Sequence, residues 1–170
     1  MGFNDDNFLD DYEIQELINK FESQLESGMP LFFDADELNI ILEHYVQKND
    51  IPKINIIADL ASTYHEANPL TKLIMAKKYL SVQDAANALP YLLDESNNSD
   101  DPDYQLSLGY CYSLMDEHKK SLLAYKKAVN LLEKENCDDI YNSMAVEYMM
   151  LRDFEHALYY FKKGIKASPD

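Results

Sequence analysis

The fold is decided by residues 141–169, which read YNSMAVEYMMLRDFEHALYYFKKGIKASP. Small residues, Ala145, Ala157 and Gly164, stand at positions where two packed helices must approach closely. Large residues, Tyr148 and Phe161, stand where the gap between such helices must be filled. The stretch therefore predicts a helix, a short turn and a second helix that packs against the first.

The same arrangement of small and large residues recurs in three earlier copies. The first close-approach position of the last copy is Ala145, and the corresponding residues towards the N-terminus are Gly109, Ala76 and Leu42. These residues are separated by about 34 positions, a period typical of arrays of helical hairpins. The large residue that follows three positions later is always a tyrosine: Tyr45, Tyr79, Tyr112 and Tyr148. We interpret these tyrosines as packing residues of a repeated unit.

This pattern resembles that of the tetratricopeptide repeat (TPR), most closely over residues 104–169. The chain departs from the family pattern at Leu42, which is not small, and at Glu95, where a small residue is expected. The resemblance implies an all-α fold, a right-handed α–α superhelix of helical hairpins. It implies four repeats, at residues 34–67, 68–100, 101–135 and 136–170, preceded by a capping segment at residues 1–33.

The capping segment is predicted from an apolar stripe at residues 7–27, which recurs at three- to five-residue steps. The stripe consists of Phe8, Tyr12, Leu17, Phe21 and Leu25. Gly28 is a natural end for this helix, since glycine readily takes the left-handed conformation of a helix terminus. A repeat array needs such a cap because each unit leaves an apolar face for its neighbour. Residues 29–33 are expected to run extended and to pack against the first repeat.

Helix starts are marked by acidic or amide residues, several of them followed by proline. The predicted starts are Asp34, Asp50, Asn68, Ser81 to Asp84, Asp101, Asp116 or Glu117, residues 136–139, and Asp153. Aspartate and asparagine cap exposed backbone N–H groups, and proline in the first turn loses no hydrogen bond there. The second helix of the second repeat is expected to extend to about Glu95, and that of the fourth repeat to about Ala167.

Composition limits the classes of partner. The chain has 170 residues, a net charge of −16 and a pI near 4.5. Such a charge argues against nucleic acid and against anionic membrane surfaces as ligands. No apolar run is long enough for a membrane span, and the N-terminus lacks the order of a secretion signal. Two cysteines, Cys111 and Cys137, fit a reduced, cytoplasmic protein.

Catalytic and metal chemistry finds little support in the sequence. Most acidic pairs fall at helix starts, where capping and first-turn charge explain them. Residues 94–105 fail as a calcium loop because the turn glycine is Ser99 and the twelfth position is Gln105. The histidines have no partners at zinc-ligand spacing, and no nucleophile motif is present. We therefore expect no enzyme activity, no cofactor and no metal.

In TPR proteins the first helix of each repeat lines a concave groove, and the resemblance carries this role to specific positions here. The implied groove residues are Asp36, Asn39, Glu43, Leu73, Lys77, Asp103, Leu106, Tyr110, Leu114, Asp139, Asn142, Val146, Met149 and Met150. Chaperone-binding TPR domains clamp a carboxylate with a Lys/Asn/Arg set, which this groove lacks. Methionine and tyrosine suit adaptable peptide contacts. The expected partner is a protein or peptide with basic and apolar residues.

Two alternatives remain open on this evidence. The apolar groove residues are equally consistent with packing against another part of a longer protein. The apolar residues Phe154, Leu158, Phe161 and Ile165 are expected to look outward in part, since no polar closing helix follows. We therefore expect the chain to be the N-terminal part of a longer bacterial TPR protein, or to dimerise through that end. In the rival interpretation it is an oligomerisation or regulatory domain whose activity lies beyond residue 170.

Overall fold

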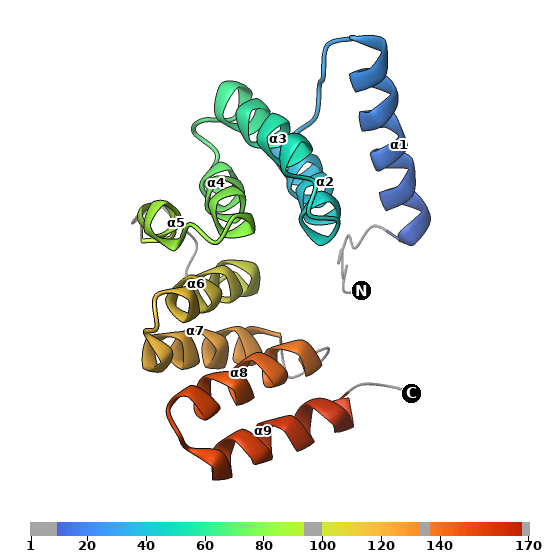
Figure 1. Ribbon diagram of the computed structural model, residues 1–170. Helices are drawn as coiled ribbons and strands as arrows, with labels where there is room; N and C mark the ends of the chain where they lie inside the picture. The colour runs from blue at the N-terminus through green and yellow to red at the C-terminus, as the bar shows by residue number, and fades with distance from the viewer. Residues whose placement is uncertain (1–9, 94–99, 133–136, 168–170) are drawn as a thin grey trace, which may run out of the picture. The chain divides into compact units, whose positions relative to one another are not determined.

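The computed structural model describes residues 10–93, 100–132 and 137–167. Within these ranges the chain folds into nine α-helices and contains no strand (Figure 1). The chain divides into two compact units, Met1–Thr71 and Lys72–Asp170. The all-α fold predicted from the repeat pattern is therefore confirmed.

The first unit contains α1 (Asp11–Ser27), α2 (Ala35–Gln47) and α3 (Ile51–Tyr64). Helix α1 packs on α2 through Phe21, whose ring lies 5.7 Å from that of Tyr45. The Tyr45 hydroxyl donates a hydrogen bond to Glu22 at 2.9 Å, which adds a polar link between the two helices. The packing expected of residues 29–33 is found only at Phe33, which is buried: its ring lies 5.8 Å from that of Phe21, and its carbonyl oxygen lies 2.7 Å from the His65 Nε2 atom of the first repeat. Met29 and Phe32 are exposed.

The stripe predicted for α1 is partly correct. Leu17 and Phe21 are buried, together with Ile18, and Gly28 ends the helix with a φ of 66°. Tyr12 was expected on the buried stripe, and this is wrong: its side chain is exposed and its hydroxyl donates to Glu16 at 2.7 Å. The hydrogen bond holds Tyr12 along the outside of the first turns. Phe8 lies outside the described residues.

The second unit contains most of α4 (Pro69–Ser81) and then α5 (Ala85–Leu92), α6 (Pro102–Leu114), α7 (His118–Leu131), α8 (Asp138–Met150) and α9 (Phe154–Ala167). Neighbouring helices pack in sequence order, with the most extensive contacts between α6 and α7 and between α8 and α9. Helix α5 ends at Leu92, before the predicted end at Glu95. Pro90 lies in its last turn and has no N–H, so this turn holds fewer hydrogen bonds.

The turn between the two helices of each hairpin has one recurring geometry. A residue with positive φ occurs at Asn49, Gln83, Asp116 and Arg152, with angles of 54–60°. The next residue then donates its backbone N–H to the carbonyl of the repeat tyrosine, at 2.9–3.0 Å in all four cases. The equivalent residues therefore adopt equivalent backbone geometry in all four turns.

Most predicted helix starts are confirmed by their caps. Asp34 and Glu37 form a reciprocal capping box, and Asp50 and Asp84 accept backbone N–H groups of the helices that they precede. Asp153 accepts the backbone N–H of His156 at 3.2 Å. Helix α8 differs, since its cap position is Cys137 and its two aspartates lie within the first turn.

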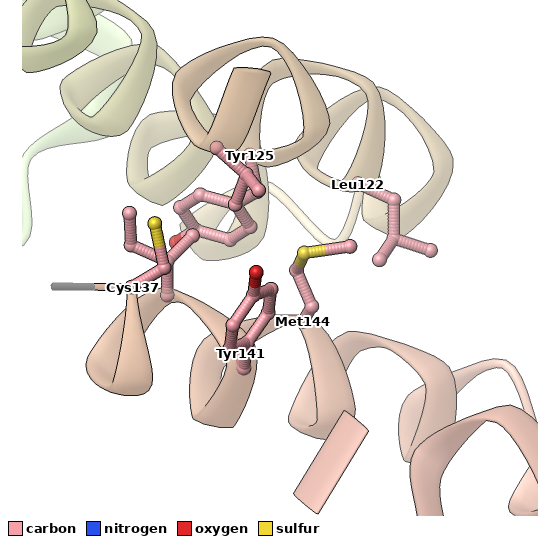
Figure 2. Close-up of a cluster of buried hydrophobic side chains, with 7 residues drawn as sticks. Leu122, Tyr125, Cys137, Tyr141 and Met144 are labelled. Carbon is pink, nitrogen blue, oxygen red and sulfur yellow. The ribbon is translucent and has the colours of Figure 1, made fainter. Parts of the chain in front are cut away.

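A cluster of buried side chains lies between α7 and α8 in the second unit (Figure 2). This buried cluster consists of Leu122, Tyr125, Val129, Cys137, Ile140, Tyr141 and Met144. Tyr148, Tyr160 and Leu106 pack against its edge. Phe161 is half-buried, so neither it nor Tyr148 points freely into solvent.

Candidate functional site

Two predicted groove residues from successive repeats form an ion pair. The Lys77 ammonium on α4 lies 3.3 Å from the Asp103 carboxylate on α6 and donates a hydrogen bond to it. The Lys77 side chain is only 11% exposed, whereas that of Asp103 is half-exposed. The pair neutralises the one cation among the predicted groove residues and links α4 to α6.

The predicted residues on α6 share one helix face but differ in accessibility. Asp103, Leu106, Tyr110 and Leu114 recur at three- and four-residue steps. Leu106 packs against the buried α7–α8 cluster, and Leu114 is half-buried. Tyr110 is 39% exposed. Tyr110 is therefore the most exposed of the predicted apolar residues on α6.

The predicted residues on α8 include a more exposed apolar stripe. Val146, Met149 and Met150 are 48%, 46% and 58% exposed, and their spacing places them on neighbouring positions of one helix face. Asp139 at the start of the helix is also exposed. We name the exposed set of Tyr110, Val146, Met149 and Met150 the apolar face.

Asn142 lies close to Gly164 of the next helix, a contact that the sequence did not indicate. A Cβ atom built at Gly164 on α9 would lie 2.6 Å from the Asn142 Oδ1 atom. The Asn142 side chain therefore packs where α8 and α9 approach closely, although the residue remains exposed. Asn142 therefore belongs to the packing of its own hairpin as well as to the predicted groove.

The remaining predicted residues are distributed differently. Leu73 on α4 is buried and offers no surface to a ligand in this structure. Asp36, Asn39 and Glu43 lie on α2, in the first unit, where Asp36 is exposed and the other two are half-buried. The second unit by itself carries the Lys77–Asp103 pair and the apolar face.

A buried contact between a histidine and a carboxylate was missed by sequence reasoning. The Glu147 carboxylate on α8 is 2% exposed and lies 2.8 Å from the His118 Nδ1 atom on α7. Burial, and then the nearby Glu147 carboxylate, raise the pKa of Tyr125 to about 12. The available signal was a lone acid inside the apolar run MAVEYMM. This pair links α7 to α8.

The described residues give no indication of a thiol, metal or membrane site. Cys111 is buried, its Sγ atom lies 3.5 Å from the Ala85 carbonyl oxygen, and burial raises the pKa of its thiol. Across the described ranges, no three His, Cys, Asp or Glu side chains converge as metal ligands. None of the helices in the described ranges has the length and apolar character needed to cross a membrane.

Comparison with known proteins supports the fold. Neither a family model nor a curated protein sequence matches this chain. The crystal structure of the APC/C hetero-tetramer Cut9–Hcn1 is similar over 91% of this chain, with a TM-score of 0.71 and 15% identity, and the match spans 29% of that chain.

Two smaller solved proteins match over most of both chains. TTC0263, a thermophilic TPR protein in Thermus thermophilus, matches 94% of this chain and 85% of its own, with a TM-score of 0.71 and 17% identity. MamA AMB-1 matches 91% of this chain and 94% of its own, with a TM-score of 0.65 and 20% identity. The chain therefore has the fold of the tetratricopeptide-repeat proteins.

Proposed function

We propose that this chain is a non-catalytic, cytoplasmic scaffold that binds a peptide or a partner helix along the first helices of its hairpins. Proteins of this fold serve in general as protein-interaction scaffolds. The observation that carries the proposal is the apolar face: Val146, Met149 and Met150 remain accessible at neighbouring positions of α8, and Tyr110 remains accessible on α6. Large apolar groups that stay exposed mark interaction surfaces when they gather in a patch.

The chemistry of the partner is inferred from the surroundings of the apolar face. Asp103 and Asp139 lie on the same two helices, and the chain carries a net charge of −16. The one predicted groove cation, Lys77, is paired with Asp103. We expect a segment with apolar anchors and Lys or Arg residues, since positive charge speeds encounter with an acidic surface.

The test uses short fluorescent peptides of defined charge. An amphipathic Lys/Leu peptide should bind the protein, whereas a Glu/Leu peptide of the same apolar pattern should not. Tyr110→Ala and Met149→Ala should each weaken binding by about 1 kcal/mol or more, as expected for anchor residues. Thermal stability should change little, because both side chains are exposed.

The matched control is Tyr159→Ala, which removes an exposed aromatic side chain from α9 outside the apolar face. This variant should bind the Lys/Leu peptide as the unmodified protein does. Equal loss of binding in Tyr159→Ala, or equal binding of both peptides, contradicts the proposal.

A second candidate function rests on α9. Phe154, Leu158 and Ile165 are exposed on this helix, and Tyr159 adds a fourth large apolar side chain. This surface favours self-association, or docking of a further part of a longer protein. Light scattering separates the two functions: a concentration-dependent dimer that Leu158→Lys converts to a monomer supports self-association through α9.

A further inference from the structure

The second helices of the last two hairpins have a charge opposite to that of the whole chain. Helix α7 carries four lysines and no acidic residue, and α9 carries three lysines and one acid, Glu155. The whole chain has 15 basic and 31 acidic residues. Such local segregation of charge indicates a surface that attracts anions.

A cavity of about 240 Å³ lies between α7, α8 and α9 within this basic region. It is lined by Lys126, Val129, Asn130, Tyr141, Met144, Tyr160 and Lys163, and we name it the α7–α9 pocket. Pockets for drug-sized ligands measure roughly 300–1,000 Å³. The α7–α9 pocket is therefore of a size for one functional group rather than a whole ligand.

The two lysines of the pocket are held by aromatic rings instead of carboxylates. The Lys163 ammonium lies 4.2 Å from the Tyr141 ring centroid, and that of Lys126 lies 5.6 Å from the Tyr148 ring centroid. Tyr148 in turn stacks on Tyr160, with centroids 5.4 Å apart. Among the residues that the structure describes, neither lysine pairs with a carboxylate. Their positive charge is thus available to a ligand.

One buried donor in the pocket wall has no acceptor. Tyr141 is 2% exposed, and its hydroxyl finds no acceptor among the described residues, since the neighbouring Lys163 ammonium can only donate to it. Figure 2 shows this hydroxyl pointing from α8 towards α7, the helix that supplies Lys126 and Asn130 to the facing wall. A buried hydroxyl without an acceptor is costly, so an incoming acceptor would be stabilised there.

We propose that the α7–α9 pocket binds a phosphate group, with Lys126 and Lys163 as charge partners and Asn130 and Tyr141 as hydrogen-bond donors. A phosphate monoester carries about −1.5 to −2 charges at neutral pH and three acceptor oxygens, which matches two ammonium groups and several donors. A single carboxylate leaves one lysine uncompensated. The site shares no residue with the apolar face, although α8 supplies Tyr141 and Met144 to its wall.

The experiment is calorimetric titration of the full chain with inorganic phosphate, phenyl phosphate, a short phosphoserine peptide and the same peptide with Glu in place of phosphoserine. We expect saturable binding of the phosphorylated probes and weaker binding of the Glu peptide. Tighter binding of the phosphopeptide than of inorganic phosphate identifies a phosphorylated partner as the source, and equal binding identifies the free ion. Absence of saturable phosphate binding, or equal affinity for the Glu peptide, overturns the proposal.

Neighbouring lysines provide matched controls. Lys126→Met and Lys163→Met keep the apolar stem and should each weaken phosphate binding by about tenfold or more, as expected for a hydrogen bond to a charged group. Lys127→Met and Lys162→Met remove the same charge from exposed positions next to them, outside the pocket, and should have less than about a twofold effect. Equal weakening by all four variants indicates diffuse attraction and contradicts a built site.

Tyr141→Phe tests the hydroxyl directly. It should weaken phosphate binding while the melting temperature of the ligand-free protein stays the same or rises, since the hydroxyl finds no acceptor among the described residues. Unchanged affinity in this variant overturns the role of the hydroxyl. The melting temperature of every variant verifies that it is folded.

Discussion

The α2–α3 hairpin and the α6–α7 hairpin place residues of opposite size at equivalent positions. In α6–α7 the first helix contributes Gly109 and the second contributes Tyr125, and a Cβ atom at Gly109 would lie 2.5 Å from the Tyr125 ring. In α2–α3 the equivalent residues are Leu42 and Ala58, and both are fully buried. The large residue has thus moved from the second helix to the first.

This exchange shows that the hairpin constrains the two positions jointly. Interiors are packed densely, so one large and one small residue fill the space that two large residues would overfill. Leu42 departs from the family pattern, and Ala58 accommodates it by being small. The remaining hairpins resemble α6–α7, with Ala76 before Leu92 and Ala145 before Phe161.

The largest expected effect comes from exchanging the pair in α6–α7. Tyr125→Ala should lower the free energy of unfolding by about 3–5 kcal/mol, because it leaves a cavity in a buried cluster. Gly109→Leu alone should cost about 3 kcal/mol through overpacking against the ring. The double variant, Gly109→Leu with Tyr125→Ala, has the order of sizes found in α2–α3. Its loss of stability should be smaller than the sum of the two single losses by about 1–3 kcal/mol. Urea unfolding measures all three.

A control tests whether this coupling is specific. Leu123 is exposed on the same helix as Tyr125, so Gly109→Leu combined with Leu123→Ala should show additive free energies. Additive free energies for the Gly109 and Tyr125 variants as well would break the comparison between the two hairpins.

A smaller loss of stability is expected in α2–α3, where the large residue, Leu42, lies on the first helix. Leu42→Ala should destabilise the protein by about 2–5 kcal/mol, because Ala58 opposite is too small to fill the space. Leu123→Ala deletes the same atoms from an exposed site and should change stability by less than about 0.5 kcal/mol. Thermal unfolding followed by circular dichroism distinguishes the two. Similar melting temperatures for both variants would show that Leu42 does not hold this hairpin.

The smallest expected effect is a loss of folding stability at alkaline pH, through the buried phenols Tyr45 and Tyr125. The pKa of Tyr45 is raised to about 12 by burial and then by its hydrogen bond to Glu22, and that of Tyr125 is raised to about 12 by burial and then by Glu147. Because the folded pKa exceeds the unfolded value near 10, this stability is full below pH 10 and is lost between about pH 10 and 12.

The measurement compares urea unfolding at pH 9 and pH 11 across the unmodified chain and its variants. Tyr45→Phe and Tyr125→Phe should each lose less stability over this interval than the unmodified chain, which also corrects for lysine titration. Glu22→Gln should reduce the loss through Tyr45 alone. An identical pH dependence in all variants would mean that neither phenol stays protonated in the folded state.

Short-range features of the fold were predictable from the sequence. The starts at Asp34, Asp50 and Asp153 depend on a side-chain oxygen that meets an N–H group three residues later. The repeat tyrosines were predicted as packing residues because their period matches the hairpin length, and each one also accepts the N–H of its turn. The early end of α5 and the exposed Tyr12 were mispredicted, because a periodic apolar stripe shows neither the weakened last turn at Pro90 nor the hydrogen bond that holds Tyr12 to Glu16.

The candidate site was only partly predictable. Among the residues at the family's groove positions, Tyr110 and Met150 are exposed and Leu73 is buried, while Asn142 is exposed but lies close to Gly164. A repeat position states which helix carries a residue, but how much of its side chain stays exposed depends on the neighbouring side chains that pack around it.

The period, the turns and most of the helix starts are determined by the sequence alone, since they depend on hydrogen bonds and packing between residues a few positions apart. Only the tertiary structure decided which distant groups meet. Lys77 pairs with Asp103, His118 pairs with Glu147, and Lys126 and Lys163 line one pocket although they are far apart in the chain. The physical reason is that side-chain charges on separate hairpins approach each other only after the apolar faces have packed and set the helix rotations.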